Sequence, residues 1–350
     1  MNIYIALTPY HLILSLASSS LRRGDAIIFI DQFAQLKKYS RLEKLEEALG
    51  VLVIYVPGIG KSIWARCLAL NPVFSKFWFS MRRSIAKLCD REAVKTIYVF
   101  NDSCPEAQFV LRAIKANTVV YIEDGSAAYN NHCLKVRSWH KVSDRLLYGM
   151  GFKRVDRIGG SDYVDSALYT YPEYINSREV VRSVGCFEPS LCALDRMRVL
   201  LASLPITLDA DLFTFGNVAL ILPPSMDILL KNKAAMEAFL MEVVVHQKAG
   251  RVVLIKGHPL GGGVYGGIFP EGCRFAPPEI SAELILAAIN SIKFVVGDYT
   301  TSLISTRFFF PQVAVTSLAW RGRYYEENMI SAFREIGVAV KVGESDVGGE

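Results

Sequence analysis

The residues best suited to chemistry follow three strand-like runs. Val-Val-Tyr-Ile at 119–122 is followed by Glu123-Asp124-Gly125. Similar runs at 251–256 and 293–299 are followed by Gly257-His258-Pro259 and Thr300-Thr301-Ser302. Because buried parallel strands deliver their carboxyl ends to one edge of a sheet, each cluster is expected at a ligand-binding edge. An acid pair, a histidine and hydroxyl groups suit the transfer of a group away from a phosphate leaving group.

The acid pair offers a general base. Side chains alternate along a strand, so one of Glu123 and Asp124 can enter a pocket while the other supports the next element. Gly125 lets the backbone turn and a substrate approach closely. A carboxylate here could take a proton from an attacking sugar hydroxyl, and plain turn chemistry after a strand is the alternative.

His258 stands at the end of the second run, where Pro259 fixes the direction of the chain. It could hydrogen-bond or protonate a departing phosphate, or simply be satisfied by the loop backbone. Lys256 either adds positive charge to the same place or is a lysine at the surface end of the strand.

Thr300, Thr301 and Ser302 open a helix-like run. Hydroxyls at a helix start usually cap the first N–H groups. The same geometry also makes an anion site, because free N–H groups and the helix dipole converge there. The sequence leaves both interpretations open.

Two further features lie outside these clusters. The glycines at 261–263 and 266–267 lack the P-loop lysine pattern and predict a mobile loop beside the site. Asp209 and Asp211 have a spacing that can bind a divalent metal, but a surface turn fits their surroundings better. We find no metal-ligand cluster.

The segment 61–91 is basic and aromatic. Its seven basic residues face a single acid, Asp90, and five Trp and Phe side chains are interleaved. This pattern predicts contact with an anionic membrane surface through Arg82, Arg83 and Lys87. The alternative is a helix pair with aromatic residues packed inward and a solvated basic face.

Bulk properties narrow the class of protein. The 350 residues favour two domains, and 51% hydrophobic residues suffice for large cores. No run of 18 uncharged apolar residues predicts a transmembrane helix, and the N-terminus favours a first strand and helix over a signal peptide. Seven scattered cysteines without a C-x-x-C indicate a reducing cytoplasm, without disulfides or structural zinc. A net charge of +5 is too small to indicate nucleic-acid binding.

Strand-like and helix-like runs alternate in both halves of the chain, which predicts parallel, doubly wound sheets. The strands are expected near 2–7, 26–30, 51–56, 96–100, 118–122, 218–222, 251–256, 293–297 and 312–316. The helices are expected near 10–22, 34–49, 61–90, 105–115, 226–248, 281–291, 301–309 and 324–336.

The predicted fold is therefore α/β, with two Rossmann-like domains facing each other across a cleft, which is the GT-B plan. An N-terminal, acceptor-side domain with the Glu-Asp-Gly motif is expected at 1–175, and a crossover of weaker periodicity at 176–216. A donor domain is expected at 217–340 and a flexible tail at 341–350.

The three clusters, in this order, resemble the motifs of one family. Bacterial sialyltransferases of GT-B type, especially lipooligosaccharide sialyltransferases and capsule polysialyltransferases, carry D/E-D/E-G, H-P and Ser-Ser/Thr motifs. Here they read Glu123-Asp124-Gly125, His258-Pro259 and Thr300-Thr301-Ser302, and the third could match at either pair of hydroxyls. The opening Ile-Ala-Leu-Thr-Pro-Tyr-His also resembles the start of those proteins, which implies an acceptor-side role for Thr8, Pro9, Tyr10 and His11.

The resemblance implies inverting transfer of sialic acid from a CMP-activated donor to an oligosaccharide or glycolipid acceptor. It assigns the general base to the acid pair, for which Glu123 is the choice, with Asp124 orienting. It places His258 and the hydroxyls near 301 on the donor phosphate. Gly125, Lys256, Gly257 and Pro259 are expected to bind the donor as well. No cofactor or metal is implied.

Other functions remain compatible with the sequence. The donor could carry Kdo or another ulosonic acid, because motifs that grip CMP do not name the sugar. A second hypothesis is a catalytically silent GT-B scaffold that binds nucleotide. A third, a nucleic-acid-binding protein, is disfavoured by the acids expected in the cleft and by the modest net charge. The acceptor, the linkage, processivity and the oligomeric state are not encoded in these motifs.

Overall fold

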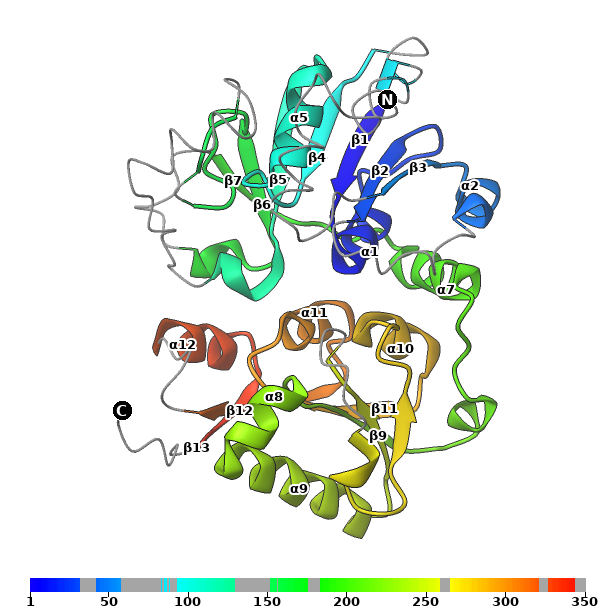
Figure 1. Ribbon diagram of the computed structural model, residues 1–350, viewed down its shortest axis with the longest axis vertical. Helices are drawn as coiled ribbons and strands as arrows, with labels where there is room; N and C mark the ends of the chain where they lie inside the picture. The colour runs from blue at the N-terminus through cyan, green and yellow to red at the C-terminus, as the bar shows by residue number, and fades with distance from the viewer. Residues whose placement is uncertain are drawn as a thin grey trace. The chain divides into compact units, whose positions relative to one another are not determined.

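A computed structural model of the chain describes residues 1–31, 42–57, 83, 85–86, 88, 93–129, 152–155, 157–175, 183–258, 265–320 and 327–343. These residues form two compact units (Figure 1). The first comprises Met1–Asp124 and Asn131–Pro205, and the second comprises Gly125–Asn130 and Ile206–Glu350. The chain therefore enters the second unit twice, because Gly125–Asn130 belong to it as well.

The first unit is built on a seven-stranded sheet in the order β3-β2-β1-β4-β5-β6-β7. Every neighbouring pair is parallel. The strands are β1 (Asn2–Ala6), β2 (Ala26–Asp31), β3 (Leu52–Pro57), β4 (Thr96–Val99), β5 (Thr118–Ile122), β6 (Ser166–Tyr169) and β7 (Ser183–Cys186). The helices are α1 (Pro9–Ala17), α2 (Glu43–Leu49), α5 (Pro105–Ala113) and α7 (Ala193–Ser203).

The second unit has a six-stranded sheet in the order β10-β9-β8-β11-β12-β13, also parallel throughout. Its strands are β8 (Val218–Leu222), β9 (Val252–Lys256), β10 (Arg274–Ala276), β11 (Ile292–Gly297), β12 (Ala314–Trp320) and β13 (Ala339–Gly343). Its helices are α8 (Met226–Lys231), α9 (Lys233–Lys248), α10 (Ala282–Ala288), α11 (Thr301–Phe309) and α12 (Glu327–Glu335). In Figure 1, α8 and α9 lie on one face of this sheet and α10, α11 and α12 on the other.

Both sheets follow the doubly wound plan. The strand order reverses between β1 and β4 in the first unit and between β8 and β11 in the second. The central strands are apolar along their whole length because helices cover them from both sides; all five residues of β8 are buried. Ligands of such folds bind beyond the carboxyl ends of the strands at the reversal, which directs attention to these two places.

The predicted α/β class and the parallel sheets are confirmed. Four short strands were not predicted, namely β6, β7, β10 and β13. Lys341–Gly343, expected in a flexible tail, pair with β12 as part of β13. The helix expected at 226–248 is two helices, because Asn232 ends α8 and its side chain accepts a hydrogen bond from Ala235 N (3.0 Å) to begin α9.

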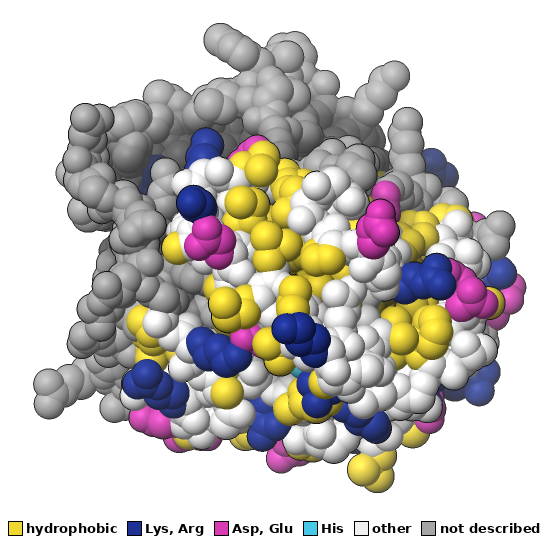
Figure 2. All heavy atoms as spheres, turned by 90° about the horizontal axis from the view of Figure 1, so that it is seen from below, with side chains coloured by type: hydrophobic (Ala, Val, Ile, Leu, Met, Phe, Trp, Pro, Cys, Tyr) yellow, Lys and Arg dark blue, Asp and Glu magenta, His cyan; other side chains and the backbone are white. Residues whose placement is uncertain are grey.

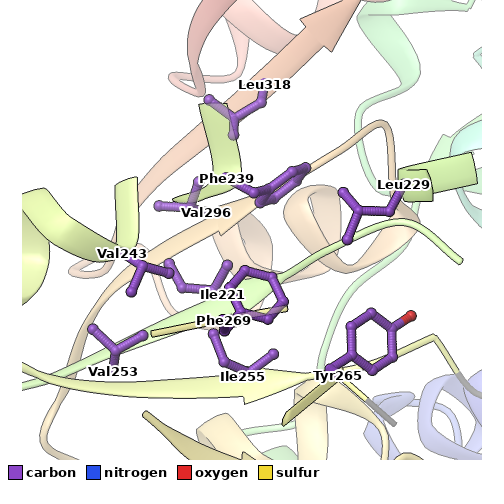
Figure 3. Close-up of a cluster of buried hydrophobic side chains, with 10 residues drawn as sticks. All are labelled: Ile221, Leu229, Phe239, Val243, Val253, Ile255, Tyr265, Phe269, Val296 and Leu318. Atoms are coloured by element: carbon purple, nitrogen blue, oxygen red, sulfur yellow. The ribbon is translucent and has the colours of Figure 1, made fainter. Parts of the chain in front are cut away.

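The core of the second unit fixes the end of β9. Phe239 and Val243 of α9 pack on Ile221, Val253 and other side chains of the sheet (Figure 3). Tyr265 lies at one end of this cluster, with its hydroxyl directed away from the other side chains. The ring is thus held by apolar packing while the hydroxyl is available to the backbone near the end of β9.

The face seen in Figure 2 mixes hydrophobic side chains with basic and acidic ones. On α9, Met241, Val244 and Val245 are exposed between charged residues. Within the described parts of the chain, no helix has the length and apolar character needed to cross a membrane. The side chains with the most specific arrangement lie instead at the carboxyl ends of the strands.

Candidate functional site

Asp124 is the best-organised carboxylate of the first unit. It follows β5, and its side chain is 24% exposed. Its Oδ1 forms a hydrogen bond with His11 Nε2, and its Oδ2 accepts from Asn101 Nδ2 (3.2 Å). Its backbone N–H donates to the hydroxyl of Tyr121 (3.1 Å). Both oxygens are therefore oriented by partners while the group remains open to solvent.

His11 is placed by the start of α1. Thr8 caps this helix by accepting from His11 N (3.2 Å), and Pro9 occupies the first turn, where its missing N–H costs nothing. The His11 ring is only 1% exposed and stacks on Phe100 at a centroid distance of 4.8 Å. Leu7 N donates to Nδ1 (3.2 Å), which puts the proton of the neutral ring on Nε2, facing Asp124.

This cluster lies at the strand reversal of the first sheet. His11 follows β1, Asn101 follows β4, and Asp124 follows β5. Thr8 and Pro9, both predicted on the acceptor side, act on the start of α1, and Tyr10 beside them is half-buried. The sequence did not single out Asn101, although its position directly after a buried strand is the same signal that marked the acid pair.

Glu123 has a different environment. Its side chain is fully buried, and its Oε2 accepts a hydrogen bond from Thr170 N (2.6 Å) beyond the end of β6. Burial raises the pKa of the nearby Tyr169 to about 12, and the charge of Glu123 adds to this effect. A carboxylate without exposed surface is less accessible to an acceptor hydroxyl than the partly exposed Asp124, and the role of Glu123 as general base stays a prediction.

Gly125 begins the short 3-10 turn Gly125–Ala128, which belongs to the second unit. Its φ of +78° is the left-handed conformation that favours glycine. A Cβ at this position would also overlap the side chain of Thr301. Gly125 is therefore required twice, by its backbone conformation and by its close approach to α11.

Thr301 uses its hydroxyl within the second unit. The Oγ1 accepts a hydrogen bond from Ser126 N (3.0 Å) and lies 3.3 Å from Ser126 Oγ. Thr300 is the N-cap of α11 and accepts from Ser302 N (3.4 Å). The capping role left open by the sequence is thus present, and the half-buried helix start still directs its dipole to the strand reversal.

Lys256 is buried at the end of β9. Its ammonium donates to the carbonyl oxygens of Gly257 (2.8 Å) and Pro278 (3.2 Å). Burial lowers the pKa of Lys256 to about 8, against the opposing effect of Glu283 and Glu279. The ammonium group lies behind the strand end, and its hydrogen bond to Pro278 O connects β9 with the segment after β10.

His258 is exposed at the end of β9. Its backbone N–H donates to the Tyr265 hydroxyl (3.4 Å), which itself donates to Pro224 O (2.9 Å). Gly257 is needed because a Cβ there would overlap the Tyr265 ring. Partial burial and the neighbouring Lys256 charge lower the pKa of His258, so its imidazole is neutral at neutral pH in the free protein.

Two acids of the second unit were missed by the sequence analysis. Burial raises the pKa of Asp298, which follows β11, to about 6. Glu283 in the first turn of α10 is buried and accepts from Ser305 Oγ of α11 (2.7 Å), which links the two helices. Asp298 could have been identified by its position directly after a strand. The residues around Glu283 give no sign that it binds Ser305, 22 residues away.

Several predicted residues carry less structural information. Pro259, Arg82, Lys87 and Gly261–Gly263 lie outside the described residues, and Arg83 is exposed. Gly266 and Gly267 belong to a 3-10 turn with Tyr265. Asp209 caps the turn Ala210–Phe213 by accepting from Asp211 N (3.1 Å), as expected of a surface turn. Among the described residues, no three His, Cys, Asp or Glu side chains gather as a metal site would require.

Comparison with known proteins identifies the fold. No family model matches the sequence, and no curated protein matches it significantly. An α/β-galactoside α-2,3-sialyltransferase from Photobacterium phosphoreum is similar in structure, with a TM-score of 0.55, 10% identity and 97% of each chain covered. The UDP-GlcNAc 2-epimerase from Methanocaldococcus jannaschii has a TM-score of 0.54 and 13% identity, with 98% of this chain and 89% of that chain covered. The two Rossmann-like units thus give this chain the fold of the GT-B type.

Proposed function

We propose that the protein is an inverting glycosyltransferase that moves sialic acid from CMP-sialic acid to a hydroxyl of a bacterial surface-glycan acceptor, such as a lipooligosaccharide or capsule precursor. The observation that carries this proposal is the Asp124 carboxylate, partly exposed and held by His11 and Asn101 at the strand reversal. The ordered set of three motifs supports the choice of CMP donor, and the fold agrees with it.

Asp124 is the general base of this proposal. Its two oxygens are oriented by the His11 and Asn101 side chains, so its remaining lone pairs point in fixed directions. As the acceptor oxygen forms its bond to the anomeric carbon, Asp124 takes the hydroxyl proton and the bond from that carbon to the phosphate oxygen breaks. CMP leaves with the bonding electrons. His11 acts as a positioning residue, because its hydrogen bond to Oδ1 orients the carboxylate.

The donor phosphate is assigned to the second unit. His258 at the end of β9 and the start of α11 are the groups available there, and the helix dipole favours an anion. Thr300 is the N-cap and accepts from Ser302 N, while Lys256 contributes charge from behind the strand end. Within this unit, Gly125 packs against Thr301 of the same helix.

The proposal includes no metal or cofactor. CMP is a good leaving group, and charge neutralisation by His258, Lys256 and the helix start can take the place of a divalent ion. Its location is proposed from the sequence. Scattered cysteines support the reducing cytoplasm, and the basic segment around Arg82, Arg83 and Lys87 supports peripheral contact with the anionic inner membrane.

One experiment tests the function. The purified protein is offered CMP-sialic acid, CMP-Kdo and UDP-GlcNAc, each with and without a panel of neutral and sialylated oligosaccharides, and products are identified by mass. We expect a product that gains one sialic acid, lost in Asp124→Asn and retained in the exposed control Asp162→Asn. Transfer of Kdo alone would name the other donor. Conversion of UDP-GlcNAc without any acceptor, or no reaction with any CMP-sugar, would overturn the proposal.

A further inference from the structure

Two tyrosines beyond β6 have no role in the chemistry described above. Tyr171 and Tyr174 lie in and beside the short 3-10 turn Pro172–Tyr174, and both are half-buried. Their ring centroids are 6.3 Å apart, and the ring planes are inclined by 47°. Partly exposed aromatic rings in such a pair offer apolar surface that the fold has not used for its own core.

The strand order puts this pair and the proposed base at the carboxyl ends of neighbouring strands. In the β5–β6 ladder, Ile122 faces Leu168, and Glu123 N continues it by donating to Leu168 O (3.1 Å). Neighbouring parallel strands are about 4.8 Å apart, so the residues after Tyr169 run alongside Glu123 and Asp124. The tyrosine pair therefore follows β6 at the same carboxyl edge of the sheet at which Asp124 follows β5.

The turn that carries the rings is rigid. Tyr174 N donates to Tyr171 O (3.2 Å), Ile175 N donates to Pro172 O (3.2 Å), and Pro172 restricts the chain at the start of the turn. The fully buried Glu123 carboxylate accepts from Thr170 N (2.6 Å), directly before Tyr171. Burying a carboxylate is costly unless it is well bonded, so this contact fixes the place where the chain leaves β6.

We propose that Tyr171 and Tyr174 form the subsite for a neutral pyranose ring of the acceptor, and that Glu123 is the positioning residue of this subsite. A pyranose has a face of C–H groups that packs on an aromatic ring, while its hydroxyls stay at the edge. Rigid tyrosines bind such a ring with little loss of conformational freedom. A hydroxyl of the bound sugar then lies within reach of Asp124. This inference rests on the proposed transfer reaction and names its acceptor class.

The kinetic test uses matched tyrosine variants. Tyr171→Ala and Tyr174→Ala are each compared with Tyr163→Ala, a half-buried tyrosine that precedes β6 at the opposite edge of the same sheet. With lactose as acceptor, we expect KM for lactose to rise about tenfold in each test variant, the loss of one good aromatic contact. Hydrolysis of CMP-sialic acid without acceptor should be unchanged. Equal effects in Tyr163→Ala, or an unchanged KM for lactose in both test variants, would overturn the proposal.

Glu123→Gln tests the positioning role. The amide keeps the shape but no longer offers a charged acceptor to Thr170 N, so KM for lactose should rise while the pH profile of kcat stays in place. A shifted pH profile with unchanged KM would make Glu123 the base instead.

A binding measurement separates failure of the subsite from failure of the function. Cys186 is exposed at the end of β7, opposite Tyr169 in the ladder, and its thiol lies near Thr170 O. Its alkylation by iodoacetamide, followed by peptide mass mapping, should slow when lactose is added, and Cys192, also exposed, provides the internal control. Protection without any transfer would retain the subsite and reject the reaction. Transfer without protection at saturating lactose would reject the subsite.

Discussion

The carboxyl ends of the two sheets hold their accessible polar groups in different ways. In the first unit, the partly exposed carboxylate of Asp124 is held by two side chains, His11 and Asn101. In the second unit, polar side chains bind the backbone: Lys256 bonds two carbonyl oxygens, Thr300 caps α11, and Thr301 accepts from a backbone N–H. The two sheets thus share one strand order but differ at their carboxyl ends. The first presents an oriented carboxylate, and in the second, polar side chains stabilise the backbone.

This difference matches the two tasks of the proposed reaction. A base must have its lone pairs aimed and its proton affinity controlled, which side-chain partners can provide. A phosphate is held by many weak donors and by the helix dipole, and these are properties of the backbone. The predictions on activity and binding come first, from the largest expected loss to the smaller one, and those on stability and metal dependence follow.

Asp124→Asn should cause the largest loss. A positioned general base contributes about 10²- to 10⁴-fold, so kcat for transfer should fall by that factor while CMP affinity is retained. Initial rates and calorimetric titration with CMP measure the two quantities. If Glu123→Gln lowers kcat more than Asp124→Asn, the division between the two acids is reversed.

His258→Ala should weaken CMP binding by about ten- to hundredfold, since a hydrogen bond to a charged group is worth about 1.5–3 kcal/mol. The lowered pKa of His258 also predicts the direction in which CMP affinity changes with pH. Phosphate favours the imidazolium, so affinity should rise as the pH falls through the pKa of His258, below 6.5.

His258→Asn controls for titration of the ligand itself. The ratio of CMP affinities between the parent protein and His258→Asn should be constant at pH 7.5–8.5 and should grow as the pH falls towards 5.5. A pH dependence identical in both proteins would remove His258 from the phosphate.

Gly125→Ala should destabilise the second unit by about 2–5 kcal/mol, because strain in the left-handed region adds to the overlap with Thr301. Gly250 provides the control: its φ is +70°, but nothing lies within 4 Å of a Cβ there. Gly250→Ala should cost only about 1 kcal/mol. Urea unfolding measures both, and equal losses would mean that the contact with α11 adds nothing.

Asp298→Asn should stabilise the protein. Burial raises the pKa of Asp298 to about 6, so the folded state binds a proton that the unfolded state has released. Stability from this group is therefore lost as pH rises towards 6, and the deficit, up to about 3 kcal/mol, is complete above it. The melting temperature of the variant should exceed that of the parent at pH 7.5 and approach it at pH 4. No gain at pH 7.5 would show that the carboxylate is well compensated.

Chelation should have the smallest effect. Full activity is expected after dialysis against EDTA, because the proposed charge neutralisation is done by His258, Lys256 and α11. Loss of activity with rescue by Mn²⁺ would contradict this and direct attention to Asp209 and Asp211.

The sequence was most informative where buried strands are apolar throughout. Runs such as Val218–Leu222 and Thr118–Ile122 are recognisable because helices cover both faces. The strands β6 and β10 were missed because Ser166–Tyr169 and Arg274–Ala276 are short and mixed in composition. These segments form strands because neighbouring strands offer them hydrogen bonds. That information is not contained in the few residues around each segment.

The candidate site shows the same limit. Position after a strand marked both acids, and alternation indicated that they differ, but alternation does not say which one faces solvent. That is decided by Thr170, 47 residues away from Glu123, and by His11, 113 residues away from Asp124. The role of Lys256 was likewise settled by the carbonyl of Pro278 after β10.

The placement of Gly125–Asn130 has a consequence for how the protein can be made and divided. Because these residues join Ile206–Glu350 while residues on both sides of them join the first unit, no single cut of the polypeptide yields two complete halves. Ser126 is synthesised long before Thr301, so the hydrogen bond between Ser126 N and Thr301 Oγ1 can form only after α11 has been made. A fragment that begins at Ile206 would lack this turn, and adding a peptide of the sequence Gly125–Asn130 is the direct way to ask whether the fragment needs it.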